Sequence, residues 1–183
     1  MPKFFAAALL FLAAAAPVGV VDLDNRPVDP FQLTAGAKAL VFLFTATDCP
    51  ISNRYAPEVR RLYQAFAAKG VRFFLVYPNP ADTPKLVREH ATSFGYPAEA
   101  LRDPKQSLVK LAQATVTPEA AVFVGRRLVY HGRIDDRYVD LALERSAPTK
   151  HDLDEALTAV LAGTPVPHPV TQAVGCYIAD FAR

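Results

Sequence analysis

The chain has 183 residues, and its 20 lysines and arginines against 18 aspartates and glutamates give a formal net charge of +2. That length suits one domain, and a content of 51% apolar residues can bury a core, which excludes wholesale disorder. So small a net charge gives no reason to expect a nucleic acid or an anionic membrane surface as partner. Two cysteines are too few for a disulfide scaffold or a four-cysteine zinc site.

The first residues have the pattern of a leader sequence. Lys3 is followed by an apolar run from Phe4 to Ala16, which is typical of a secretory signal peptide. The run is shorter than the roughly 20 residues that span a bilayer, and no later stretch is long and apolar enough to do so. We expect residues 1–16 to be a signal peptide with an approximate end, and the mature protein to be extracytoplasmic, either periplasmic or secreted. A buried N-terminal helix is the alternative.

The next segments alternate between strands and helices. Turn residues within 20–36 predict a small hairpin, and the apolar run Ala39–Phe44 predicts a strand buried on both faces. From Ile51 to Phe66 apolar residues recur every three or four positions, which predicts an amphipathic helix that Gly70 ends. A second apolar strand is expected over Val71–Tyr77.

The second half continues the alternation. Thr83 and Pro84 open a helix that reaches about Phe94, and a shorter helix is expected from Asp103 to about Ala112. The spacing of the later elements predicts a strand hairpin over 120–131 and then a helix over 150–162 capped by Thr149. Residues 20–162 are therefore expected to form one α/β domain with a mixed central sheet, followed by a tail over 163–183.

Cys49 is the most informative residue, because it lies between a buried strand and the first turn of a helix. A helix N-terminus favours negative charge and lowers a thiol pKa. The neighbouring Asp48 opposes this effect, since an adjacent anion disfavours a thiolate. Asp48 also has an ordinary interpretation as the helix N-cap.

Two motifs resemble those of thioredoxin-fold proteins. The segment Cys49-Pro50-Ile51-Ser52, with Pro57 eight residues after the cysteine, is similar to the active-site segment of that family, and Thr117-Pro118 is similar to its Thr-Pro loop. The longer separation of the two motifs resembles the redoxin branch, which includes peroxiredoxins and extracytoplasmic thiol-disulfide oxidoreductases. The resemblance implies a thioredoxin-like three-layer sandwich with helices on both faces of the sheet. It also implies a cis Pro118, with Thr117 and Pro118 lining a substrate groove beside the nucleophile Cys49, and Asp48, Pro50 and Ser52 surrounding the thiol at the helix N-terminus.

The chain also departs from the patterns that it resembles. Ser52 stands where thioredoxins have their second cysteine, and Leu43 stands in place of their buried acid. Phe42 and Ala46 occupy the places of the proline and the hydroxyl residue that precede a peroxiredoxin thiol. A copper chaperone of this fold would need a cysteine at position 53, which is Asn53, and a histidine near Thr115 and Val116. We therefore expect no metal and no organic cofactor.

Cys176 is the candidate partner of Cys49. It lies in the tail after Gly163, and thirteen extended residues reach at most about 45 Å, enough to cross a domain of this size. Our hypothesis is that Cys176 resolves a mixed disulfide formed at Cys49. Two alternatives remain open, namely an unpaired buried thiol in a docked tail and a static disulfide with Cys49.

The remaining candidates are weaker. His131 lies in a segment dense in charged and hydroxyl groups, which we interpret as an exposed hairpin end rather than a border of the thiol site. The four histidines are scattered, so no structural zinc site is expected.

The sequence as a whole predicts an extracytoplasmic thiol-disulfide oxidoreductase. Its partners would be protein or small-molecule thiols and disulfides, with a thiol reductant as electron donor. Two alternatives are a peroxiredoxin-like thiol peroxidase and a non-catalytic binding module with a structural Cys49–Cys176 disulfide.

Overall fold

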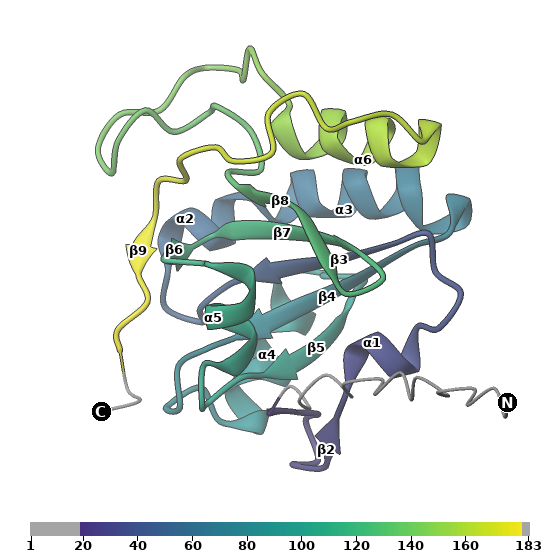
Figure 1. Ribbon diagram of the computed structural model, residues 1–183. Coiled ribbons are helices and arrows are strands. Elements are labelled where there is room, and N and C mark those ends of the chain that lie inside the picture. Colours follow the sequence, from purple (N-terminus) through teal and green to yellow (C-terminus); the bar gives the residue numbers. More distant parts are fainter. Residues whose placement is uncertain (1–18, 181–183) are drawn as a thin grey trace, which may run out of the picture.

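The computed structural model describes residues 19–180, so the predicted signal peptide lies outside the described residues. A seven-stranded sheet forms the centre of the molecule (Figure 1), in the order β2-β1-β5-β4-β3-β7-β8. Its strands are β1 (Val20–Val21), β2 (Pro27–Val28), β3 (Ala39–Phe44), β4 (Val71–Tyr77), β5 (Glu99–Arg102), β7 (Glu119–Val124) and β8 (Arg127–Gly132). A separate pair consists of β6 (Val116–Thr117) and β9 (Cys176–Tyr177).

The sheet is mixed, as the sequence predicted. β3 runs parallel to β4, and β4 runs parallel to β5, because helical crossovers join them. β7 runs antiparallel to both β3 and β8, since β7 and β8 form the predicted hairpin. The predicted N-terminal hairpin is also present, as β1 paired antiparallel with β2.

Helices cover both faces of the sheet and complete the three-layer α/β fold. They are α1 (Pro30–Leu33), α2 (Pro50–Arg54), α3 (Ala56–Phe66) with the 3-10 turn η1 (Ala67–Lys69), α4 (Pro84–Ser93), α5 (Ser107–Ala112) and α6 (Asp152–Ala162). In Figure 1, α3 and α6 run side by side along one face, and an ion pair between Arg61 and Asp154 joins them. α1 and α5 pack on the opposite face.

The central strand β3 explains the two cores. Every residue of β3 is buried, and alternate side chains of a strand point to opposite faces. Val41 and Leu43 therefore enter the core under α3 and α6, while Phe42 and Phe44 enter the core under α1 and α5. The position of this strand fixes where the loop from Thr45 to Cys49 leaves the sheet.

The structure corrects several predicted boundaries. The long helix is divided at Tyr55, because Pro57 has no N–H with which to continue the ladder. Asp48 was expected to cap this helix, but Cys49 holds the N-cap position and makes no side-chain capping bond. Thr149 was expected to cap α6, but His151 holds that position, and the Thr149 hydroxyl donates to Asp136.

The tail after α6 does not extend into solvent. In Figure 1 it returns from α6, crosses the end of β8 and reaches β6, where it forms β9. Within residues 19–180, no helix combines the length and the apolar character that a membrane crossing requires.

Candidate thiol site at the end of β3

Cys49 lies at the junction that its sequence predicted. The loop after β3 brings it to the first turn of α2, where its backbone is extended, with φ −88° and ψ 109°. Only 1% of the residue is exposed. α2 has just five residues and Pro50 has no N–H, so few aligned peptide groups are available to stabilise a thiolate through a helix dipole. Direct hydrogen bonds must therefore supply most of that stabilisation.

The Thr117–Pro118 loop faces the thiol. The peptide bond between the two residues is cis, as the resemblance implied. The Cys49 sulfur lies 3.1 Å from the Thr117 carbonyl oxygen. The buried carboxylate of Glu119 accepts from the backbone N–H groups of Thr115, at 2.8 Å, and Val116, at 3.2 Å, and so holds the loop in place.

Cys176 lies next to Cys49 and the Thr117–Pro118 loop. β9 pairs antiparallel with β6 so that Cys176 lies opposite Thr117. Its sulfur is 2.8 Å from that of Cys49, and both cysteines are thiols. Disulfide bonds are about 2.05 Å long, so little movement separates this arrangement from a covalent bond. The structure thus brings together residues 127 positions apart in the chain.

Two glycines allow the tail to approach this closely. A Cβ on Gly175 would lie 2.2 Å from the Thr117 carbonyl oxygen, and one on Gly132 would lie 2.1 Å from the Thr171 carbonyl oxygen. Neither position leaves room for a side chain, so both contacts depend on glycine.

Hydrogen bonds fasten the tail to the edge of β8. The N–H of His131 donates to the Pro169 carbonyl at 3.0 Å, and the N–H of Thr171 donates back to the His131 carbonyl at 3.1 Å. The Thr171 hydroxyl lies 2.8 Å from the Tyr130 hydroxyl and accepts from the N–H of Arg133 at 3.1 Å. The segment around His131 is therefore not the exposed hairpin end that was expected, because the tail covers it.

The surroundings of the two thiols shift their pKa values in opposite directions. Burial raises the pKa of Cys49, but hydrogen bonds from Cys176, from the hydroxyl and N–H of Ser52 and from the hydroxyl of Thr117 outweigh it, so the net pKa is lowered. Burial, the hydrogen bond to Cys49 and the charges of Cys49 and Asp48 raise the pKa of Cys176 to about 12. Cys49 is thus the more readily ionised member of the pair and Cys176 the less readily ionised one.

A hollow of about 180 Å³ opens beside the pair. It is lined by Ala46, Asp48, Pro78, Asn79, Thr117, Cys176, Tyr177, Ile178 and Ala179. Cys176 is partly exposed there, whereas Cys49 is not among the lining residues. Asp48 is exposed and lines the same hollow. Its side chain therefore lies beside the two cysteines and does not cap α2.

The comparisons with known proteins agree with this geometry. A sequence model described as the AhpC/TSA family matches residues 12–130, well over half of the chain. The chain belongs to the AhpC/TSA family. No curated protein matches the sequence.

Solved structures extend the likeness over the whole fold. An uncharacterised conserved protein from Geobacillus kaustophilus is 29% identical, with a TM-score of 0.76 over 90% of this chain and 88% of that one. A hypothetical protein from Sinorhizobium meliloti 1021 is 25% identical, with a TM-score of 0.76 over 94% and 95%. A secreted disulfide oxidoreductase from Mycobacterium tuberculosis, described as homologous to DsbE of E. coli, is 14% identical, with a TM-score of 0.51 over 79% and 93%, and shares the thioredoxin-like fold.

Within this AhpC/TSA fold, the sequence departures have a structural counterpart. Phe42, in the place of the peroxiredoxin proline, is fully buried in the core under α1 and α5. Ala46 lines the hollow but carries no hydroxyl. Ser52, in the place of the second thioredoxin cysteine, is buried, and its hydroxyl makes no other hydrogen bond within residues 19–180. That hydroxyl is therefore free to donate to the Cys49 sulfur.

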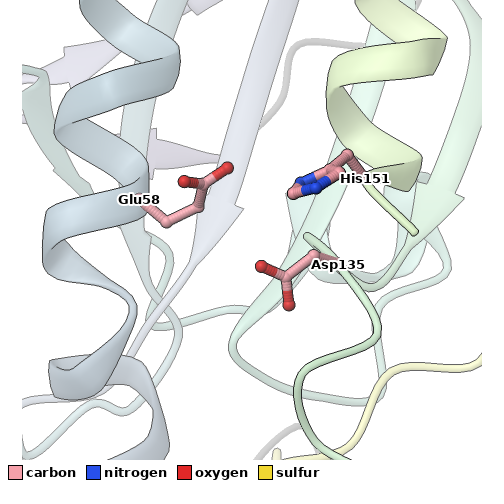
Figure 2. A group of neighbouring side chains, drawn as sticks. All are labelled: Glu58, Asp135 and His151. Carbon is pink, nitrogen blue, oxygen red and sulfur yellow. The ribbon is translucent and has the colours of Figure 1, made fainter. Parts of the chain in front are cut away.

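A second group of polar side chains lies apart from the thiols, and among residues 19–180 it is the one place where three potential metal ligands come together. Glu58 of α3, Asp135 after β8 and His151 before α6 point toward one another, with one ligand atom from each within 4.8 Å of the others (Figure 2). However, Arg61 binds both oxygens of Glu58, at 2.9 and 2.7 Å, and Asp135 already accepts from Tyr55 at 2.6 Å. A metal ion would have to displace Arg61, so the group is better explained as an ion-pair network.

Sequence reasoning missed the residues that hold the site together. Glu119, Tyr130 and Thr171 touch no sulfur, but they fix the loop and the tail that carry Thr117 and Cys176. An acid directly after the Thr-Pro motif and before the apolar run of β7 was a usable signal for Glu119, because a carboxylate that is buried there needs hydrogen-bond donors. Nothing in the local sequence indicates that Thr171 pairs with Tyr130.

Proposed function

We propose that this chain is an extracytoplasmic thiol-disulfide oxidoreductase in which Cys49 is the nucleophile and Cys176 is the resolving thiol. The observation that carries the proposal is the 2.8 Å approach of the two sulfurs on paired strands beside the Thr117–Pro118 loop. The lowered pKa of Cys49 supports its assignment as the attacking group, since a thiolate is the nucleophile in disulfide exchange.

The reaction consists of two exchanges. The Cys49 thiolate attacks one sulfur of a substrate disulfide, and the other substrate sulfur leaves as a thiolate and takes up a proton. Cys176 then loses its proton and attacks the Cys49 sulfur of the mixed disulfide, which releases the second substrate thiol. The substrate gains two electrons, and the protein is left with a Cys49–Cys176 disulfide.

The burial of Cys49 sets a condition on the first exchange. With 1% of the residue exposed, a substrate sulfur reaches it only after Cys176 moves aside. β9 is a two-residue strand with solvent on part of its surface, so such a movement breaks few contacts. Thr117 and Pro118 would then line the groove in which the substrate lies.

The extracytoplasmic location rests on the leader pattern over residues 1–16. An oxidising compartment also suits a pair of thiols that can close a disulfide. Cell fractionation of the full-length chain tests this part of the proposal, with the processed protein expected outside the cytoplasm and an unprocessed cytoplasmic protein as the contrary result.

The activity is tested with oxidised glutathione and reduced protein. We expect the native chain to close an internal disulfide and release two glutathione thiols, and Cys176→Ser to retain one glutathione on Cys49. Cys49→Ser should react more than about tenfold more slowly, because little Cys176 is ionised at neutral pH. Equal rates for the native chain and Cys49→Ser would contradict the assignment, as would peroxide consumption by the native chain that outpaces its exchange with disulfides.

A further inference from the structure

The two sulfurs differ in access from solvent. Cys49 is 1% exposed, and its sulfur lies 3.1 Å from the Thr117 carbonyl oxygen and 2.8 Å from the Cys176 sulfur. Cys176 is partly exposed and lines the 180 Å³ hollow, whereas Cys49 does not. When the pair is oxidised, a thiol from solvent therefore meets Cys176 first.

We propose that the hollow beside Cys176 binds the thiol that reduces the oxidised protein, and that this thiol attacks the Cys176 sulfur and leaves Cys49 as the departing thiolate. The proposal deepens the proposed function, on which it rests. The substrate disulfide reacts at Cys49 in one half of the cycle, and the reducing thiol reacts at Cys176 in the other half.

Geometry favours this direction of attack. In disulfide exchange the incoming sulfur, the attacked sulfur and the leaving sulfur lie close to one line. An attack on Cys176 with Cys49 as leaving group therefore approaches from the side of Cys176 that faces away from Cys49. An attack on Cys49 would have to come through the interior, where Cys49 is packed in the core under α3 and α6.

The pKa shifts of the two cysteines also favour attack at Cys176 with Cys49 as the leaving group. A thiol of lower pKa leaves faster in exchange. The hydrogen bonds that lower the pKa of Cys49 stabilise it as the departing thiolate, whereas the pKa of Cys176 is raised. Departure of Cys49 is thus favoured over departure of Cys176.

The chemistry balances without a further reactant. A thiolate RS⁻ attacks Cys176, the Cys49–Cys176 bond breaks, and the products are an RS–Cys176 disulfide and the Cys49 thiolate. A second RS⁻ attacks the R sulfur of that mixed disulfide and releases Cys176, which takes up a proton. Two thiols are oxidised to one disulfide, and the protein gains the two electrons.

The hollow also indicates which thiols it accepts. Among the described residues that line it, Asp48 is the one charged side chain, and it is exposed at the opening. A carboxylate there repels an incoming anion and attracts a cation. We therefore expect uncharged or positively charged thiols to react faster than negatively charged ones of similar size and thiolate content.

The site of attack is tested by mapping the first adduct. Oxidised full-length protein is mixed with 2-mercaptoethanol, quenched with acid within the first turnover and digested for mass spectrometry. The adduct is expected on Cys176, with Cys49 recovered as a free thiol. Recovery of the adduct on Cys49 would overturn the inference and leave the proposed function intact, whereas failure of the protein to form the internal disulfide would remove the proposed function itself.

The charge preference is tested with three thiols: cysteamine, 2-mercaptoethanol and 3-mercaptopropionate. After correction for thiolate content, cysteamine should react about threefold to fivefold faster than 3-mercaptopropionate, a range typical of one solvent-exposed charge at close distance. Asp48→Asn should reduce that ratio to near one. Glu89→Gln, which removes the same charge from the exposed surface of α4, should leave it unchanged. A ratio that persists in Asp48→Asn would contradict the assignment of the hollow.

Discussion

At the scale of single residues, the reactivity of Cys49 depends on which groups donate hydrogen bonds to its sulfur. Burial alone would raise its pKa, and the donors from Cys176, Ser52 and Thr117 bring it down. Since α2 begins with Pro50 and has five residues, the helix itself contributes little. The side chain at position 52, where thioredoxins have a cysteine, is therefore a hydrogen-bond donor to Cys49 instead of a second thiol.

Ser52→Ala is predicted to raise the pKa of Cys49, because it removes a donor that stabilises the thiolate. The rate of alkylation by iodoacetamide, followed against pH in the reduced protein, measures that pKa. At a pH below the native midpoint, the variant should react more slowly by about the ratio of the two thiolate fractions.

Ser93→Ala is the matched control, since Ser93 is exposed at the end of α4, remote in sequence from either cysteine. It should leave the pH profile unchanged. A profile for Ser52→Ala identical to that of the native protein would show that the Ser52 hydroxyl does not contact the thiolate.

Residue-level expectations from the sequence succeeded where the chemistry is local. Cys49 lies at the end of β3, and Thr117-Pro118 has a cis bond and faces it, both as the motifs implied. Asp48 failed as a cap because the chain turns one residue later, so that Cys49 takes the N-cap position and the Asp48 side chain faces the hollow. A one-residue shift of a helix start is beyond what propensities can resolve.

At the scale of elements, the tail over residues 164–180 determines whether the two sulfurs meet. It has no helix of its own and is held by backbone pairing to β8 and β6, by the Thr171 hydroxyl and by the close contact at Gly175. Each of these contacts can be weakened without touching either cysteine.

Gly175→Ala is predicted to separate β9 from β6, because the new Cβ would lie 2.2 Å from the Thr117 carbonyl oxygen. The Cys49–Cys176 disulfide should then become easier to reduce, which equilibration in glutathione redox buffers measures. Gly19→Ala is the control, since a Cβ there meets its nearest atom at an ordinary 3.4 Å. Unchanged potentials for both variants would argue against the close strand contact.

Thr171→Val is predicted to loosen the contact between the tail and β8. The substitution keeps the shape of the side chain but removes the hydroxyl that accepts from Arg133 N–H, and an unpaired buried donor costs about 1–3 kcal/mol. Hydrogen exchange should accelerate at the N–H groups of His131 and Thr171, and reduced Cys49 should be alkylated faster. Native exchange rates at both amides would contradict this role.

The sequence allowed most elements to be predicted but not all of their limits. Continuous apolar runs predicted β3 and β4, and turn residues predicted the β7–β8 hairpin. β5 was missed because its residues, Glu-Ala-Leu-Arg, favour a helix, and only pairing with β4 makes them a strand. β6 and β9 were missed because two-residue strands have no periodicity, and they form only when distant segments meet.

At the scale of the whole molecule, closing the disulfide joins the tail to the core across 127 positions. A loop of this length removes much chain entropy from the unfolded state, which the chain-entropy model puts at about 5 kcal/mol. The oxidised protein is therefore predicted to unfold at a higher urea concentration than the reduced protein. The Cys49→Ser/Cys176→Ser variant should show one midpoint in either condition, and coincident midpoints for the native protein would contradict the prediction.

The global architecture followed from residues 20–162, since buried strands and amphipathic helices leave few alternatives to a mixed sheet covered on both faces. The path of the tail could not be predicted in the same way. Its length showed that it could cross the molecule, but its docking depends on Gly132, Thr171 and Gly175 meeting groups that are far away in sequence. Long-range contacts of this kind have no local signature.

The central claim is that Cys49 and Cys176 form one redox pair within a chain. Its most direct test is peptide mapping by mass spectrometry under non-reducing conditions, after mild oxidation of the full-length protein. We predict a single linked peptide that joins Cys49 to Cys176 in a monomeric chain, and its disappearance on reduction. Recovery of both cysteines as free thiols, or of disulfides that join two chains, would contradict the claim.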